Sequence, residues 1–157
     1  MKPTILPVTL VLGLLFSCAS APQEQKEEQK SAALPLSGTW RLISGATITK
    51  GDTAVTDYTK GMSMIKIING SHFAFLKHNQ EAPKDSSNQF DGGGGSYTLE
   101  GNTYTEHLDY YGDRNWEGKT FTFTVSISND TLTQKGIEKV EGAGVDHEII
   151  ERYVRLK

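Results

Sequence analysis

The sequence predicts an all-β protein, an eight-stranded antiparallel up-and-down meander closed into a barrel. Apolar and polar residues alternate along most of the chain after Gly38, most clearly in "KTFTFTVSI" (residues 119–127), and a period of two is typical of strands. Asn-Gly, Gly-Asn and Asn-Asp pairs separate these runs at 69–70, 101–102 and 129–130, and such pairs close tight hairpins. No ten-residue stretch of this part of the chain carries a helical stripe. Strands with one apolar face remove their open edges by closing into a barrel.

Each alternating run predicts one strand, and neighbours in sequence should pair. The expected strands are 38–44, 62–68, 72–77, 95–100, 103–110, 119–127, 131–136 and 147–156. The pattern of the fifth run places Tyr104, Glu106, Leu108 and Tyr110 on one face. Because the last run alternates less clearly, either of its faces could point inward.

Four consecutive glycines, residues 92–95, pose the question of a phosphate-binding loop. Such a loop needs a preceding strand, a following Lys-Ser or Lys-Thr, and then a helix. Here Ser96 follows and the next run reads as a strand, so a nucleotide site is not expected. We expect the glycines to lead from a loop, residues 78–92, into a strongly curved strand. That loop is long enough to be a lid over the barrel mouth, or it is an inert insertion.

The N-terminus has the pattern of a secretory signal. Lys2 precedes a short apolar run, which ends in "LFSC" at residues 15–18. This ending resembles the lipobox of bacterial lipoproteins. The resemblance implies cleavage before Cys18, a diacylglycerol on its sulfur, and an acyl chain such as palmitate on the new amine. It also implies an envelope location, at the outer membrane and facing the periplasm or the cell surface.

Three segments follow from this pattern. Residues 1–17 are expected to be a lipoprotein signal peptide, and residues 18–36 the lipidated cysteine and a flexible tether. The tether is rich in Ala, Gln, Glu and Lys and cannot bury enough apolar surface to fold. Residues 37–157 are expected to be the barrel domain, which is long enough for one core.

"GTWRLISG", residues 38–45, resembles the first strand of the calycins, which include lipocalins and fatty-acid-binding proteins. The resemblance implies that Gly38 and Trp40 form a structural plug at one barrel end, with Arg155 or Arg152 across the indole ring. Residues 37–157 as a whole are similar to small lipocalin-like lipoproteins of Gram-negative bacteria. The chain departs from fatty-acid-binding proteins at Glu151, where those proteins have an arginine that holds the ligand carboxylate.

The calycin resemblance favours an inward face with Glu151, Tyr153 and Arg155 on the last strand. With neighbouring strands this face gives the candidate ligand-binding residues: Tyr104, Glu106, Glu151, Tyr153, Arg155, Phe73, Phe75, Phe121 and Phe123. Buried charges are costly unless paired. The polar members therefore either satisfy one another and fix strand register, or orient the polar end of a small amphipathic ligand held by the phenylalanines.

The expected function is the binding of a small hydrophobic or amphipathic molecule by a membrane-anchored protein that is not an enzyme. A non-catalytic interaction module with a filled barrel is the first alternative. A barrel isomerase or lyase with Glu106 as general base is the second. The four histidines lack metal-site spacing, and a formal charge of −3 with scattered lysines and arginines does not suggest nucleic acid. No cofactor or metal is expected. Trp116 is either an exposed contact residue at a loop or, as we favour, a plug over the barrel end.

Overall fold

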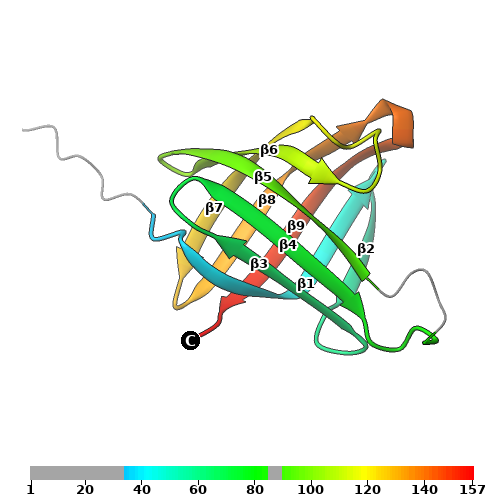
Figure 1. Ribbon diagram of the computed structural model, residues 1–157, viewed down its shortest axis with the longest axis horizontal. Coiled ribbons are helices and arrows are strands. Elements are labelled where there is room, and N and C mark those ends of the chain that lie inside the picture. Colours follow the sequence, from blue (N-terminus) through cyan, green and yellow to red (C-terminus); the bar gives the residue numbers. More distant parts are fainter. Residues whose placement is uncertain (1–33, 85–89) are drawn as a thin grey trace, which may run out of the picture. The chain divides into compact units, whose positions relative to one another are not determined.

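The computed structural model describes residues 34–84 and 90–157, which form a barrel of antiparallel strands (Figure 1). The expectations for residues 1–33, Cys18 and its lipid included, lie outside the described residues. The strands are β1 (Gly38–Thr49), β2 (Asp52–Asp57), β3 (Met62–Ile68), β4 (His72–Asn79), β5 (Phe90–Glu100), β6 (Thr103–Tyr111), β7 (Thr120–Ser128), β8 (Thr131–Val140) and β9 (Val145–Arg155). A single 3₁₀ turn, Glu141–Ala143, joins β8 to β9.

Strand pairing closes the barrel and confirms the expected fold class. From β3 to β9 each strand pairs with the next, β1 pairs with β3, and β9 returns to β1. The closing ladder runs from Trp40 opposite Arg155 to Ile48 opposite Glu148, with a bulge between Leu42 and Ser44. Eight strands, β1 and β3–β9, therefore form a closed ring, in which β1 pairs with β3 through Gly38–Arg41.

Strand β2 was not expected from the sequence. It pairs with the second half of β1, from Ser44 opposite Asp57 to Thr49 opposite Asp52. The hairpin turns at Lys50 and Gly51, both with positive φ. All six residues of β2 are exposed, so the strand has no buried face and leaves no alternating pattern to detect. The first strand is correspondingly longer than expected, ending at Thr49 instead of 44.

The glycine run lies inside β5 and pairs on both sides, with β4 and with β6. The expected start of this strand at residue 95 is therefore wrong, because β5 begins at Phe90. The expected loop over residues 78–92 is too long at both ends, because β4 continues to Asn79. Residues 85–89 lie outside the described part. A Cβ at Gly94 would lie 2.5 Å from the carbonyl oxygen of Phe73, and one at Gly95 would overlap the backbone of β6. The glycines thus let three strands approach closely where the sheet curves.

One end of the barrel is closed by Trp40, as the calycin resemblance implied. The side chain is fully buried, and its Nε1–H donates to the Leu36 carbonyl at 2.8 Å. The guanidinium carbon of Arg155 lies 4.0 Å from the indole ring centroid. Arg155 also donates to the carbonyls of Ser37 (2.8 Å) and Pro35 (2.6 Å), so it ties the segment before β1 to the end of β9.

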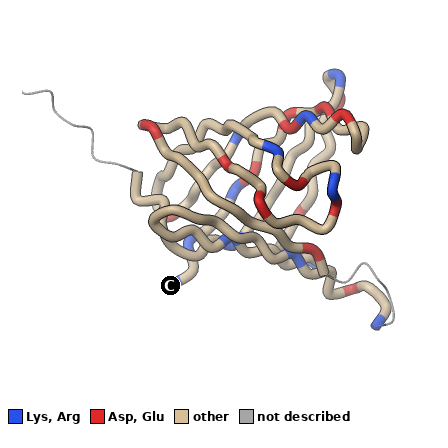
Figure 2. The backbone as a smooth tube through the Cα atoms, turned by 45° about the horizontal axis from the view of Figure 1, so that its top comes forward, with Lys and Arg blue, Asp and Glu red and all other residues tan. Residues whose placement is uncertain are grey.

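Along the backbone of the described residues, lysine and arginine positions alternate with aspartate and glutamate positions and do not gather on one strand (Figure 2). Among residues 34–84 and 90–157, no helix has the length and apolar character needed to cross a membrane.

Candidate functional site

A buried ion pair lies at the centre of the barrel. Lys66 on β3 points inward and is 3% exposed, because Met64, Lys66 and Ile68 share the inner face of that strand. Its Nζ lies 2.6 Å from Glu106 Oε1 on β6 and donates to Gln134 Oε1 on β8 at 3.1 Å. Glu106 and Gln134 are themselves buried. Three strands are therefore joined through one ammonium group.

Three aromatic rings surround the same ammonium. The Nζ of Lys66 lies 5.5 Å from the ring centroid of Phe73, 5.8 Å from that of Tyr104 and 5.7 Å from that of Tyr153. These distances fall in the range of cation–π attraction. The rings are almost completely buried and belong to the packed core. Lys66, Glu106 and Gln134 thus lie between this core and the remaining space inside the barrel, and we call these three residues the Lys66 floor.

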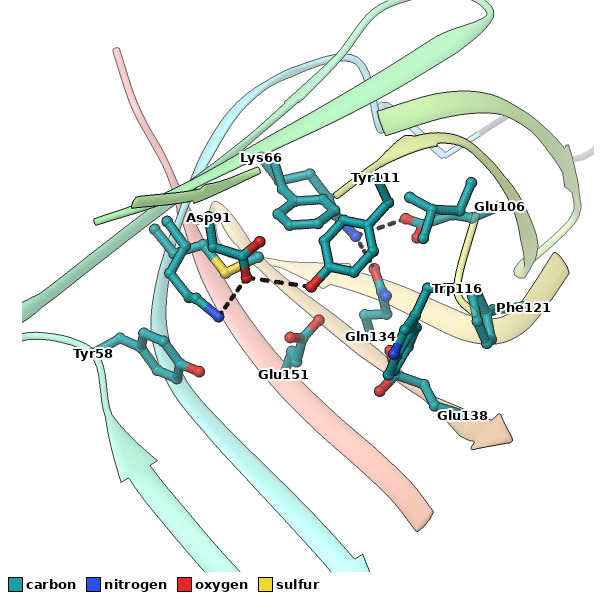
Figure 3. A pocket seen from close by; sticks show the side chains of 14 residues that line it. Tyr58, Lys66, Asp91, Glu106, Tyr111, Trp116, Phe121, Gln134, Glu138 and Glu151 are labelled. Carbon is teal, nitrogen blue, oxygen red and sulfur yellow. Dashed lines mark hydrogen bonds and ion pairs between the residues drawn. The ribbon is translucent and has the colours of Figure 1, made fainter. Parts of the chain in front are cut away.

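Above this floor lies a cavity of about 290 Å³, close to the lower limit of about 300 Å³ for small-molecule sites. Aromatic and charged side chains surround it together (Figure 3). It is lined by Tyr58, Met64, Lys66, Phe75, Lys77, Asp91, Glu106, Leu108, Tyr111, Trp116, Phe121, Gln134, Glu138 and Glu151.

Part of the cavity wall is held by a second, less buried ion pair. Lys77 Nζ on β4 lies 2.8 Å from Asp91 Oδ2 on β5, and the Tyr111 hydroxyl donates to the same oxygen at 3.4 Å. Trp116 packs against Tyr111, with ring centroids 6.1 Å apart, and against Phe121 at 5.7 Å. The loop between β6 and β7 therefore contributes an indole ring to the wall. Trp116 is half-buried and acts as a cover rather than as an exposed contact residue.

Glu151 on β9 points into the cavity (Figure 3). Its Oε2 accepts a hydrogen bond of 2.6 Å from the Tyr153 hydroxyl. Within the described part of the chain no lysine or arginine forms an ion pair with this carboxyl. Burial raises the pKa of Glu151; the charge of Lys66 and the Tyr153 hydrogen bond oppose this, and nearby Glu138 and Glu106 add to it. Burial, and to a smaller extent the Glu151 charge, also raise the pKa of Tyr58 across the cavity, while Lys77 lowers it.

Glu138 on β8 is the other cavity carboxylate without a lysine or arginine partner among the described residues. Its Oε2 lies 3.0 Å from His147 Nε2, which balances the charge only when the imidazole is protonated. Glu138 contributes to the raised pKa of Glu151, so the two carboxylates act on one another.

Four of the nine candidate residues line the cavity: Phe75, Glu106, Phe121 and Glu151. Four others, Phe73, Tyr104, Phe123 and Tyr153, lie buried in the core. The face that the calycin resemblance favoured on the last strand does point inward. Arg155, the ninth candidate, does not line the cavity: it lies against Trp40 at the closed end, and no ion pair joins it to a cavity carboxylate.

The alternation placed Tyr110 on one face with Tyr104, Glu106 and Leu108, and this prediction is wrong. Tyr110 is 71% exposed, whereas Tyr111 is half-buried and lines the cavity. The register of β5 with β6 shifts between Gly94 and Ser96. This bulge changes the alternation of β6 after Leu108, and a strict period of two does not anticipate it.

Lys66 and Gln134 are the main functional residues that the sequence did not indicate. Lys66 lies in "MSMIKII", where apolar residues occur on both faces and hide which face is buried. Gln134 lies two residues after Leu132 in "TLTQKG", so the alternation of this strand places both side chains on the same face. Tyr58, Lys77, Asp91 and Glu138 lie near strand ends or in connections, where alternation gives no direction.

Comparison with known proteins gives a limited result. No protein-family model matches the chain, and no curated protein matches it. A solved structure of a lipocalin-like protein from Bacteroides uniformis is similar at 19% identity, covering 77% of this chain and 98% of that chain, with a TM-score of 0.49. An uncharacterized protein from Bacteroides eggerthii is similar at 14% identity, covering 76% and 98%, with a TM-score of 0.45. The strand pairing of this chain is itself that of a closed, lipocalin-like eight-stranded barrel.

Proposed function

We propose that the barrel binds one small amphipathic molecule in the cavity above Lys66, and that the protein is held at a membrane by a lipid on Cys18. The cavity of about 290 Å³ is the observation that supports the binding of a small molecule. Its lining combines aromatic rings with a few convergent polar groups, as is typical of small-molecule sites.

The cavity argues against a barrel that is merely filled. Side chains pack tightly in the lower half, from Trp40 to Tyr104 and Tyr153, all of which are fully buried. Close packing stops at Lys66, above which the cavity begins. An interaction module that uses only its loops has no need for such a space.

A barrel enzyme has less support than a binding protein. The general base suggested by the sequence, Glu106, is 7% exposed, and Lys66 Nζ lies 2.6 Å from one of its oxygens. A general base must come within hydrogen-bond reach of the proton that it removes, and this contact occupies part of the group that would do so. We therefore propose binding without catalysis.

Native mass spectrometry of the protein from its own host, followed by thermal-shift assays with a lipid and metabolite panel, tests the binding proposal. We expect a co-purifying small molecule or a panel member that raises the melting temperature. Met64→Trp should block the effect because Met64 lines the cavity. Ile67→Trp on the outer face of the same strand, where Ile67 is 42% exposed, should not. If no molecule co-purifies and no panel member shifts the wild-type protein, the binding proposal is wrong.

The lipid anchor predicts that Cys18→Ser moves the protein from the membrane fraction to the soluble fraction. The serine hydroxyl cannot accept the thioether-linked diacylglycerol, and without several acyl chains membrane attachment is not stable. Cell fractionation with immunoblotting measures the change. Ser17→Ala keeps a small residue before the cysteine and should remain in the membrane fraction. Continued membrane attachment of Cys18→Ser would contradict the anchor.

A further inference from the structure

We infer that the ligand is an organic cation whose ammonium group binds Glu151, with Glu138 contributing attraction and the aromatic wall holding the apolar body. This inference rests on the proposed function and narrows it to one ligand class. It follows from the charges that remain in the cavity once its internal ion pairs are counted.

Six side chains with formal charge line the cavity: Lys66, Lys77, Asp91, Glu106, Glu138 and Glu151. Each lysine already has its own carboxylate, at 2.6 Å for Lys66 with Glu106 and 2.8 Å for Lys77 with Asp91. Two carboxylates, Glu138 and Glu151, remain without a lysine or arginine partner in the described part of the chain. The cavity lining therefore holds two more carboxyl groups than ammonium groups.

The position of Glu151 makes it the primary anchor. Tyr153 holds one carboxylate oxygen at 2.6 Å, which fixes the orientation of the group and leaves the other oxygen facing the cavity without a hydrogen bond from a described residue. An ammonium group at this oxygen would supply the missing charge partner. Glu151 is half-buried, so water screens its charge less than at the open surface, and a cation at this oxygen would be attracted correspondingly more strongly.

The aromatic residues of the wall are suited to the same ligand. Tyr58, Tyr111 and Trp116 line the cavity together with Glu151, and aromatic faces attract ammonium groups, Trp most strongly. Phe121, Leu108 and Met64 supply apolar surface from β7, β6 and β3. A small amine with an aromatic or short aliphatic body can therefore contact the carboxylate of Glu151 with its ammonium group and the apolar side chains with its body.

An anionic ligand fits the same cavity poorly. Lys66 is 3% exposed and already contacts Glu106 and Gln134, and Lys77 is engaged with Asp91. A carboxylate ligand would have to displace one of these partners while facing Glu151 and Glu138. A neutral ligand meets no such repulsion but leaves Glu151 unpaired.

Three probes of matched shape test the inference: 2-phenylethylamine, 2-phenylethanol and phenylacetate, titrated by calorimetry at pH 7.5. We expect the protonated amine to bind at least tenfold more tightly than the alcohol, and phenylacetate to bind least. Glu151→Gln should lower amine affinity at least tenfold and leave alcohol affinity within about twofold. Glu148→Gln is the matched control, because Glu148 lies on β9 outside the cavity and pairs with Lys135 at 3.2 Å. It should bind the amine as the wild type does.

Melting temperature separates a binding role for Glu151 from a structural one. The pKa of Glu151 is raised on folding, mainly by burial, so its ionised form disfavours the folded state above that pKa. Glu151→Gln should therefore melt at or above the wild-type temperature at pH 7.5 while amine binding falls. Equal or tighter binding of the alcohol or phenylacetate would overturn the cation inference and leave the binding proposal standing. If neither these probes nor the metabolite panel bind, the proposed function itself fails.

Discussion

Replacing Lys66 with Met should lower the free energy of unfolding by about 3–5 kcal/mol, the usual cost of leaving one member of a buried ion pair alone. Glu106 is 7% exposed and would remain inside the barrel without the ammonium group that now lies 2.6 Å away. Gln134, 1% exposed, would lose a donor to its amide oxygen. Urea denaturation followed by tryptophan fluorescence measures the change.

The double variant Lys66→Met/Glu106→Leu identifies the cause. When both charges are removed, apolar side chains of similar size take their place, and buried pairs replaced in this way often cost little. We expect the double variant to recover most of the loss. Lys135→Met is the surface control, since the Lys135–Glu148 pair is partly exposed and should contribute less than about 1 kcal/mol. A loss for Lys66→Met no larger than for Lys135→Met would show that the central pair does not stabilise the barrel.

The barrel itself was predictable because its strands alternate strongly. Phe121, Phe123 and Val125 occur at every second position and are buried, and residues 129–130 mark the next hairpin, where both have positive φ. The closure of the first strand on the last was also foreseeable, from Trp40 and Arg155 and the resemblance they carry. The strands and hairpins depend on local pattern, which a single sequence displays directly, whereas the closure came from the resemblance.

The site was less predictable, because it depends on departures from that pattern. The bulge in β6 brings Tyr111 rather than Tyr110 to the cavity. The charge that pairs with Glu106 comes from Lys66, which is 40 residues away in sequence, and apolar neighbours on both faces conceal its direction. Arg155 has the required charge but lies at the closed end. Which acid pairs with which base depends on strand register across the barrel, and residue spacing along the chain does not contain that information.

The plug at the closed end should be as important for stability as the central pair. Trp40→Ala removes a fully buried indole, and such changes typically cost about 3–5 kcal/mol. The variant also removes the hydrogen bond to Leu36 and the ring beneath Arg155. Circular dichroism during urea denaturation measures this loss without depending on tryptophan fluorescence.

Trp116→Ala is the informative comparison, because it truncates the same side chain at the cavity. Trp116 is half-buried and lines the cavity wall, so its removal should cost less stability than Trp40→Ala and should weaken ligand binding instead. The two tryptophans thereby separate the roles of the two halves of the barrel: one half is packed for stability, and the other keeps a space open. Equal stability losses for the two variants, or Trp40→Ala within about 1 kcal/mol of wild type, would contradict this division, since a fully buried Trp rarely costs so little.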